Sequence, residues 1–257
     1  MKKFLLTLAV ALIPSVALAA GGAKMPLEHI ELDRTNEASL QCGMATFVNN
    51  CLGCHSAQYQ RYERSATDLN IPANLVEEHL IFGDQKIGEQ MTIAMKPADS
   101  ATFFGNPPPD LTLETRLRGP DWVYTYLKSF YKDESRPWGV NNALFKDVGM
   151  PNVLEHLQGT VTNRCSDEEL VQRGLKSDID PLTGVSLPGC LTVDNGTGSL
   201  EPAEFDKVIY DLVNYMAYMA EPSKADSHRI GTNVLIFLFF FFFIAFALKK
   251  EYWKDIH

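Results

Sequence analysis

The pattern of apolar and polar residues gives the chain an apolar segment near each end and a long mixed part between them. Near the N-terminus, two lysines precede the apolar run 4–13, and the small residues Ala17 to Ala19 follow it. This order is typical of a secretory signal with a small-residue cleavage site, so residues 1–19 are predicted to be a signal peptide. The alternative is an N-terminal membrane helix, but about ten apolar residues before Pro14 are too few to span a bilayer.

The second apolar segment lies near the C-terminus. Residues 234–248 contain no charged side chain and include five consecutive phenylalanines, and residues 230–233 extend the uncharged span. This length approaches the ~20 residues that a bilayer core requires, which predicts a transmembrane anchor over 230–249. A buried core helix is the alternative, but nothing amphipathic interrupts the run. Lysines and interfacial aromatic residues follow at once, so the positive-inside rule predicts that the tail 250–257 is cytoplasmic.

Residues 20–228 are predicted to form one domain, because no repeat or low-complexity linker divides them and about 200 residues can bury a sizeable core. Apolar residues recur at helical spacing just before Cys51 and again over 202–220, which predicts a helix in each place. Two more helices are predicted, one over about 73–82 and one over 121–131, the latter capped by its first residue, an aspartate. The fold class is therefore mostly α.

Long loops are predicted between these helices. Residues 96–119 are rich in proline and glycine, which indicates an extended loop. Residues 160–200 are predicted to be an excursion from the core, bracketed by Cys165 and Cys190. In an oxidising compartment these two thiols are expected to pair, and closing their 26-residue loop would stabilise the fold by roughly 3.5 kcal/mol. Cys42 is left over and is expected to be a buried, unpaired thiol.

The charge of the predicted domain is strongly negative. Residues 20–228 contain 30 Asp or Glu and 17 Lys or Arg, a net charge of -13. Such a field favours basic partners and disfavours nucleic acid. Surplus carboxylates also keep an exported domain soluble, and composition alone does not separate the two roles.

The strongest chemical signal is the run Cys51-Leu52-Gly53-Cys54-His55. A Cys-x-x-Cys-His run is the attachment signature of a c-type haem, because two thiols on one side of a tight turn can bond the haem vinyl groups and the histidine can bind the iron. A thioredoxin-like dithiol should adjoin a strand of a βαβ unit, and a zinc site needs a second ligand pair. Neither context is present in the sequence. We therefore predict one covalently attached haem c, bound by Cys51, Cys54 and His55.

The second axial ligand decides between two classes of function. A vacant or labile position would indicate a haem enzyme or sensor, whereas a filled one only passes electrons. Met150 lies between Gly149, which permits close backbone approach, and Pro151, which prevents helix formation, and this suits a thioether that points at a metal. Met95, just ahead of another proline, is the main rival, and spacing alone does not exclude it.

Four runs of the sequence are similar to those of a known family: residues 50–62, 104–118, 148–154 and 210–222. They resemble cytochrome c1, the haem c subunit of the quinol to cytochrome c oxidoreductase of proteobacteria. The resemblance implies that Met150 is the sixth ligand and that Arg118 meets a haem propionate, with a surface salt bridge as the alternative role for Arg118. A carbonyl of residues 107–109 is expected to accept the ring N–H of His55. Trp122 departs from the family, which commonly has a tyrosine that reaches a propionate there.

The resemblance also implies a function and partners. The chain would be a membrane-anchored carrier of the respiratory chain that takes electrons from a Rieske iron-sulfur protein and passes them to a cytochrome c acceptor. Cytochrome b would be its neighbour in the bacterial inner membrane, with the haem domain in the periplasm. It would then be an electron-transfer subunit of an oxidoreductase complex, and whether the isolated chain is an enzyme stays open. A stand-alone anchored cytochrome c shuttle is the alternative.

Overall fold

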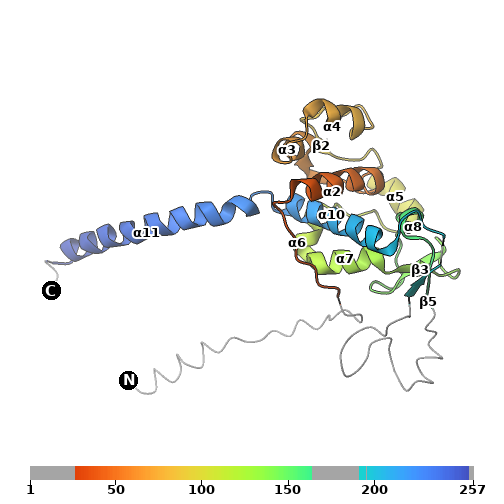
Figure 1. The fold of residues 1–257 in the computed structure, drawn as a ribbon. Helices are drawn as coiled ribbons and strands as arrows, with labels where there is room; N and C mark the ends of the chain where they lie inside the picture. Colours follow the sequence, from red (N-terminus) through yellow and green to blue (C-terminus); the bar gives the residue numbers. More distant parts are fainter. Residues whose placement is uncertain (1–26, 164–190, 195, 255–257) are drawn as a thin grey trace, which may run out of the picture.

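The computed structural model describes residues 27–163, 191–194 and 196–254 (Figure 1). Over these residues the fold is mostly helical, with long loops and one apolar helix at the C-terminal end, which confirms the predicted fold class. The predicted signal peptide lies outside the described residues.

The two central helices form where the sequence predicts them. Helix α2 (Glu37–Asn50) begins at Asn36, whose side chain accepts a hydrogen bond from an amide of the first turn. Helix α10 (Pro202–Ala220) begins at Glu201, which forms a reciprocal capping box with Glu204. Because such caps satisfy amides that a helix leaves unpaired, the local sequence marks where each helix starts.

Helices α2 and α10 lie side by side at the centre of the domain (Figure 1). A Cβ atom at Gly43 would lie 2.0 Å from the carbonyl oxygen of Asp211, so only glycine permits this approach. Phe47 and Tyr215 pack between the helices with ring centroids 5.9 Å apart. The apolar stripe of α2 packs on α10. Cys42, predicted to be buried, is exposed.

Helix α7 (Pro120–Lys128) also packs on α10 and differs from the predicted helix at both ends. Asp121 does not cap it, because this carboxylate accepts hydrogen bonds from His29 Nδ1 at 2.9 Å and from the amide of Ile30 at 3.1 Å. The prediction that the helix continues to Tyr131 is wrong, since the chain turns at Ser129 into a short strand.

The prediction of one extended loop over residues 96–119 is wrong in part. Helix α5 (Pro97–Phe104) and helix α6 (Glu114–Arg118) lie within it. Proline occupies the first turn of α5, where the amide hydrogen that it lacks would have no partner within the helix. Gly105 and Gly119 follow the two helices with positive φ values of 83° and 91°. These residues mark helix ends here. The remaining short helices are α3 (Tyr62–Asp68), α4 (Ala73–His79) and α8 (Glu155–Gln158).

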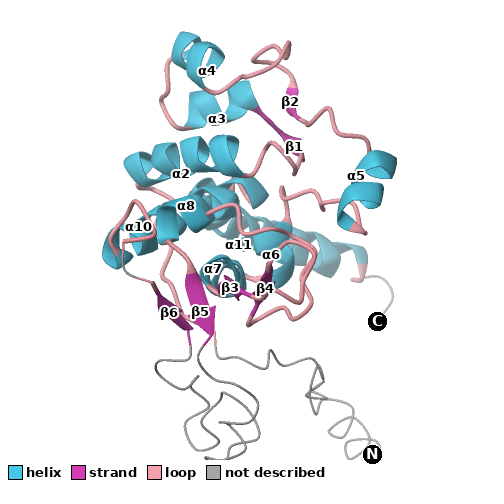
Figure 2. Ribbon diagram, turned by 90° about the vertical axis from the view of Figure 1, so that its right-hand side faces the viewer, coloured by secondary structure: helices cyan, strands magenta, loops and turns pink. Residues whose placement is uncertain are grey.

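Three two-stranded antiparallel ribbons border the described helices (Figure 2). Thr162 pairs with Thr192, so the two ends of the predicted excursion 160–200 meet in a ribbon. Cys165 and Cys190, predicted to pair, lie outside the described residues. The ribbons are β1 (Ala57–Arg61) with β2 (Gln90–Met91), β3 (Phe130–Lys132) with β4 (Val140–Asn142), and β5 (Val161–Asn163) with β6 (Leu191–Val193).

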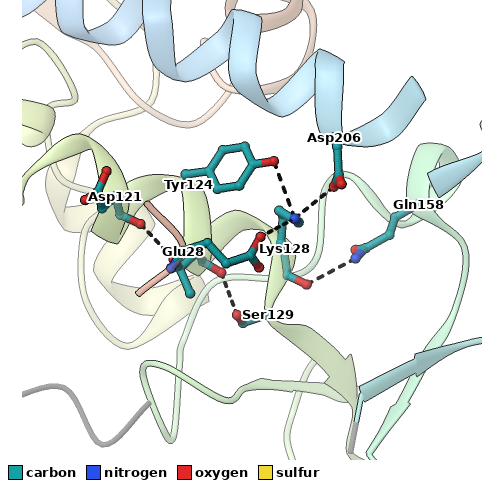
Figure 3. Close-up of polar contacts among 8 residues, drawn as sticks. Glu28, Asp121, Tyr124, Lys128, Ser129, Gln158 and Asp206 are labelled. Atoms are coloured by element: carbon teal, nitrogen blue, oxygen red, sulfur yellow. Dashed lines mark hydrogen bonds and ion pairs between the residues drawn. The ribbon is translucent and has the colours of Figure 1, made fainter. Parts of the chain in front are cut away.

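A polar cluster around Lys128 ties the N-terminal segment to α7 and α10 (Figure 3). The ammonium group lies 2.6 Å from a carboxylate oxygen of Glu28 and 2.9 Å from one of Asp206, and its nitrogen is 3.4 Å from the Tyr124 hydroxyl. Burial lowers the pKa of Lys128, but the hydrogen bonds to Glu28 and Asp206 raise this pKa by more, so the lysine stays charged. Gln158 donates to the carbonyl of Lys128 at 3.1 Å and joins α8 to the cluster.

Helix α11 (Lys224–Tyr252) extends away from the domain (Figure 1). Its part Ile230–Tyr252 has a mean hydropathy of 2.4, is not buried against the domain, and is long enough to cross a membrane. Only residues 221–223 separate α10 from α11. The anchor predicted over 230–249 falls within α11.

Candidate cofactor site

The Cys-x-x-Cys-His run forms a tight turn at the end of α2. The amides of Cys54 and His55 both donate to the carbonyl oxygen of Cys51, at 3.1 and 2.9 Å. The Cys51 side chain is buried, and this burial raises the pKa of its thiol to about 12. Cys54 is partly exposed. The turn thus presents two thiols and an imidazole from five consecutive residues.

A cavity of about 340 Å³ adjoins this turn, within the usual size range of small-molecule sites. Its walls come from the turn, the proline run 107–109, helices α6 and α7, and residues 145–153, with Met216 from α10. Most of these lining residues are apolar. The structure brings all the predicted site residues to this one cavity, and Met95 is not among its lining residues: the predicted residues are Cys51, Cys54, His55, Arg118 and Met150.

The imidazole of His55 is buried and oriented by the backbone. Its Nδ1 lies 2.7 Å from the carbonyl oxygen of Pro109, which confirms the expectation for residues 107–109. Burial lowers the pKa of His55, so at neutral pH the ring is neutral, donates from Nδ1 and leaves Nε2 as the atom that can bind a metal. The next residue, Asp110, accepts a hydrogen bond of 2.7 Å from the amide of Gln58, and this bond holds the backbone at Pro109 in place.

The loop that carries Met150 is held by two asparagines of β4 that the sequence reasoning did not identify. Asn142 Oδ1 accepts from the amides of Leu144 and Phe145 at 3.0 and 2.9 Å. Asn141 Oδ1 accepts from the amide of Asp147 at 2.9 Å. Side chains of asparagine commonly bond nearby amides in turns, so the Asn-Asn pair was a signal for an ordered loop. These bonds fix the path of the chain just before Met150.

Helices α6 and α7 supply an aromatic and cationic wall of the cavity. The hydroxyl of Tyr126 lies 3.5 Å from Met150 Sδ, and burial raises the pKa of this tyrosine. The rings of Tyr126 and Trp122 stack with centroids 5.0 Å apart. The Arg118 guanidinium lies 4.3 Å from the Trp122 ring centroid, and its Nε donates to Glu114. Arg118 therefore reaches the cavity wall with a cation that is 39% exposed.

The donor set fits a haem c. Two thiols, a neutral imidazole with one free nitrogen and a thioether line a largely apolar cavity that also has a cation in its wall, and these groups match the vinyl, iron and propionate positions of that cofactor. Among the described residues, no three His, Cys, Asp or Glu side chains gather to hold a bare metal ion. His156 is exposed and does not line the cavity.

Comparison with known proteins gives matches over most or all of the chain. The Cytochrome C1 family matches residues 29–256. Cytochrome c1 of Allochromatium vinosum is 46% identical over 257 residues, which cover 100% of both chains. The ammonia monooxygenase gamma subunit of Nitrosomonas europaea is 39% identical and covers 100% of this chain and 99% of its own. Cytochrome c1 of Rhodospirillum rubrum is 24% identical over 250 residues, or 87% of this chain and 84% of its own.

Proposed function

The chain belongs to the cytochrome c1 family, and from this premise we propose that it passes electrons from a Rieske iron-sulfur protein to a cytochrome c acceptor through one covalently attached haem c. Membership makes it a haem c electron-transfer subunit of the cytochrome bc1 complex. We further propose the Rieske protein as its electron donor, a cytochrome c as its acceptor and cytochrome b as its neighbour in the bilayer.

The observation that carries the proposal is the convergence of five side chains on one cavity. In the proposed site, Cys51 and Cys54 would bond the haem covalently, His55 and Met150 would bind its iron, and Arg118 would pair with a propionate. When bound, the haem supplies a one-electron iron couple. These five side chains support an electron carrier rather than a haem enzyme or sensor, because two of them would occupy both axial positions of the iron.

Each proposed ligand has its orientation set by neighbouring groups. The Pro109 carbonyl fixes the ring of His55 and makes its Nε2 more basic. Met150 follows a loop held by Asn141 and Asn142, so its thioether is presented by a backbone with a fixed path. A thioether opposite an imidazole raises the iron potential. The protein would therefore accept electrons readily from a donor of slightly lower potential.

The proposed placement in the membrane follows from the ends of the chain. Residues 1–19 would be removed as a signal peptide, residues 20–228 would face the periplasm, and residues 230–249 would anchor the protein in the bacterial inner membrane. The exposed apolar surface of α11 supports this anchor. Lysines directly after it support a cytoplasmic tail at 250–257.

Acid extraction tests the covalent attachment. Acidified acetone should leave the red pigment on the wild-type chain, because thioether bonds survive acid, and extraction of the pigment into acetone would refute the proposal. Replacing Cys51 and Cys54 by Ala should abolish the bound pigment. Cys42→Ala is the matched control, since this thiol is exposed and does not line the cavity.

Purification tests the proposed partners. Gentle solubilisation followed by affinity capture should recover cytochrome b and a Rieske iron-sulfur protein with this chain. Recovery of a haem-loaded chain without either protein would favour the stand-alone shuttle instead.

A further inference from the structure

We infer that Tyr126 is a positioning residue for Met150, whose hydroxyl donates a hydrogen bond to the thioether sulfur, holds it toward the cavity and raises the reduction potential of the site. This inference rests on the proposed function, because it takes Met150 as the axial ligand. Both side chains line the cavity, and the hydroxyl oxygen lies 3.5 Å from Sδ. A thioether sulfur is a weak acceptor, so the hydroxyl is the donor of this pair.

The Tyr126 ring is fixed from two sides. Trp122, one turn earlier on α7, stacks on it with an interplanar angle of 10°. Phe130, just after α7, meets its edge with centroids 5.2 Å apart and an interplanar angle of 71°. Such offset and edge contacts restrict ring rotation. The hydroxyl therefore has little freedom to leave the sulfur of Met150.

The backbone of Tyr126 is linked to the same loop that carries Met150. Its carbonyl oxygen accepts a hydrogen bond from Asn142 Nδ2 at 2.8 Å. The other end of that amide group, Oδ1, accepts from the amides of Leu144 and Phe145, which begin the loop. One side chain thus connects α7 to the loop. The distance from hydroxyl to sulfur is set by fixed parts of the fold on both sides.

The hydrogen bond should favour the reduced state. A donor on the thioether withdraws electron density from the sulfur, and the oxidised iron depends more than the reduced iron on density that its ligands supply. Hydrogen bonds to metal ligands tune potentials in this way. Removing the hydroxyl should therefore stabilise the oxidised form and lower the midpoint potential.

Tyr126→Phe in the full-length haem-loaded protein tests the inference, because it removes the hydroxyl and keeps the ring stack. A neutral hydrogen bond shifts an equilibrium by roughly two- to tenfold. We expect the equilibrium constant for reduction of the protein by a fixed mediator to decrease by about that factor. A tenfold decrease corresponds to a midpoint potential lower by about 59 mV. The near-infrared sulfur-to-iron band of the oxidised protein should remain but shift.

Tyr124→Phe is the matched control, because it removes a hydroxyl from the same helix at a side chain that does not line the cavity. Its potential should equal that of the wild type. An unchanged or raised potential in Tyr126→Phe would overturn the inference. Absence of the near-infrared band from the wild type would instead refute Met150 as ligand, so the two failures are distinguishable.

A measurement on the wild type keeps the test independent of any variant. In the reduced, diamagnetic protein, nuclear magnetic resonance should show a Tyr126 hydroxyl proton that exchanges slowly with water and has cross-peaks to Met150 side-chain protons. A hydroxyl proton in fast exchange, without such cross-peaks, would contradict the hydrogen bond.

Discussion

Gly43→Ala should destabilise the domain more than its size suggests. The glycine lies in the contact between α2 and α10, and an added Cβ would lie 2.0 Å from the carbonyl oxygen of Asp211 and 2.6 Å from Cβ of Tyr215. Favourable carbon contacts are about 3.5–4.0 Å long. The helices would therefore have to separate by about 1 Å or more.

The expected cost follows from two opposing effects. Overpacking of a core costs about 1–3 kcal/mol and occasionally more, and the obstacle here includes backbone, which cannot rotate away as a side chain can. Alanine in place of glycine inside a helix by itself stabilises the helix by about 1 kcal/mol. The net loss should be about 2 kcal/mol, which lowers the melting temperature by about 4–8 °C for a domain of this size.

Thermal unfolding of the full-length protein in detergent, followed by circular dichroism, measures this loss. Gly231→Ala is the control, because Gly231 is also inside a helix but a Cβ there would meet no atom within 4 Å. It should leave the melting temperature unchanged or slightly raised. If Gly43→Ala melts within about 1 °C of the control, the close approach of α2 and α10 is wrong.

Three further predictions concern the ligand, the N-terminal segment and the acceptor. Met150→Leu should abolish the near-infrared sulfur-to-iron band, whereas Met95→Leu should retain it; the opposite result would reassign the ligand. The hydrogen bond that His29 donates to Asp121 raises the pKa of His29 above 6.5. This contact therefore stabilises the fold below pH 6.5, and the stabilisation is lost as pH rises through the raised pKa. A nuclear magnetic resonance titration should show this, and Asp121→Asn should lower that pKa; an unchanged value would contradict the pairing. Reduction of a basic cytochrome c acceptor should slow as salt increases, because residues 20–228 carry a net charge of -13. A rate independent of ionic strength would exclude electrostatic docking.

The helices that the sequence predicted best are those with local signals at their ends. Helix α10 has its proline and capping glutamates within four residues, and α2 has its capping asparagine. The loop predicted over 96–119 was wrong in part because proline and glycine are equally typical of loops and of helix ends. Asp121 failed as a cap because a segment about 90 residues away uses its carboxylate.

The residues of the candidate site also differ in how far the local sequence identifies them. Cys51, Cys54 and His55 are contiguous, so their chemistry is readable from the sequence alone. Met150 could not be separated from Met95 by spacing, and the cavity that only one of them lines is a tertiary feature. Tyr126 was missed because its role depends on a contact across 24 positions of the chain.

The ribbon of β5 and β6 has a consequence for engineering. Val161 to Asn163 pair in register with Leu191 to Val193, and none of these residues lines the cavity. The paired strands hold residues 163 and 191 next to each other. Lengthening such a closed segment costs only about 0.6 kcal/mol for each doubling. An affinity tag or a fluorescent reporter inserted between the two strands should therefore cost the fold little stability.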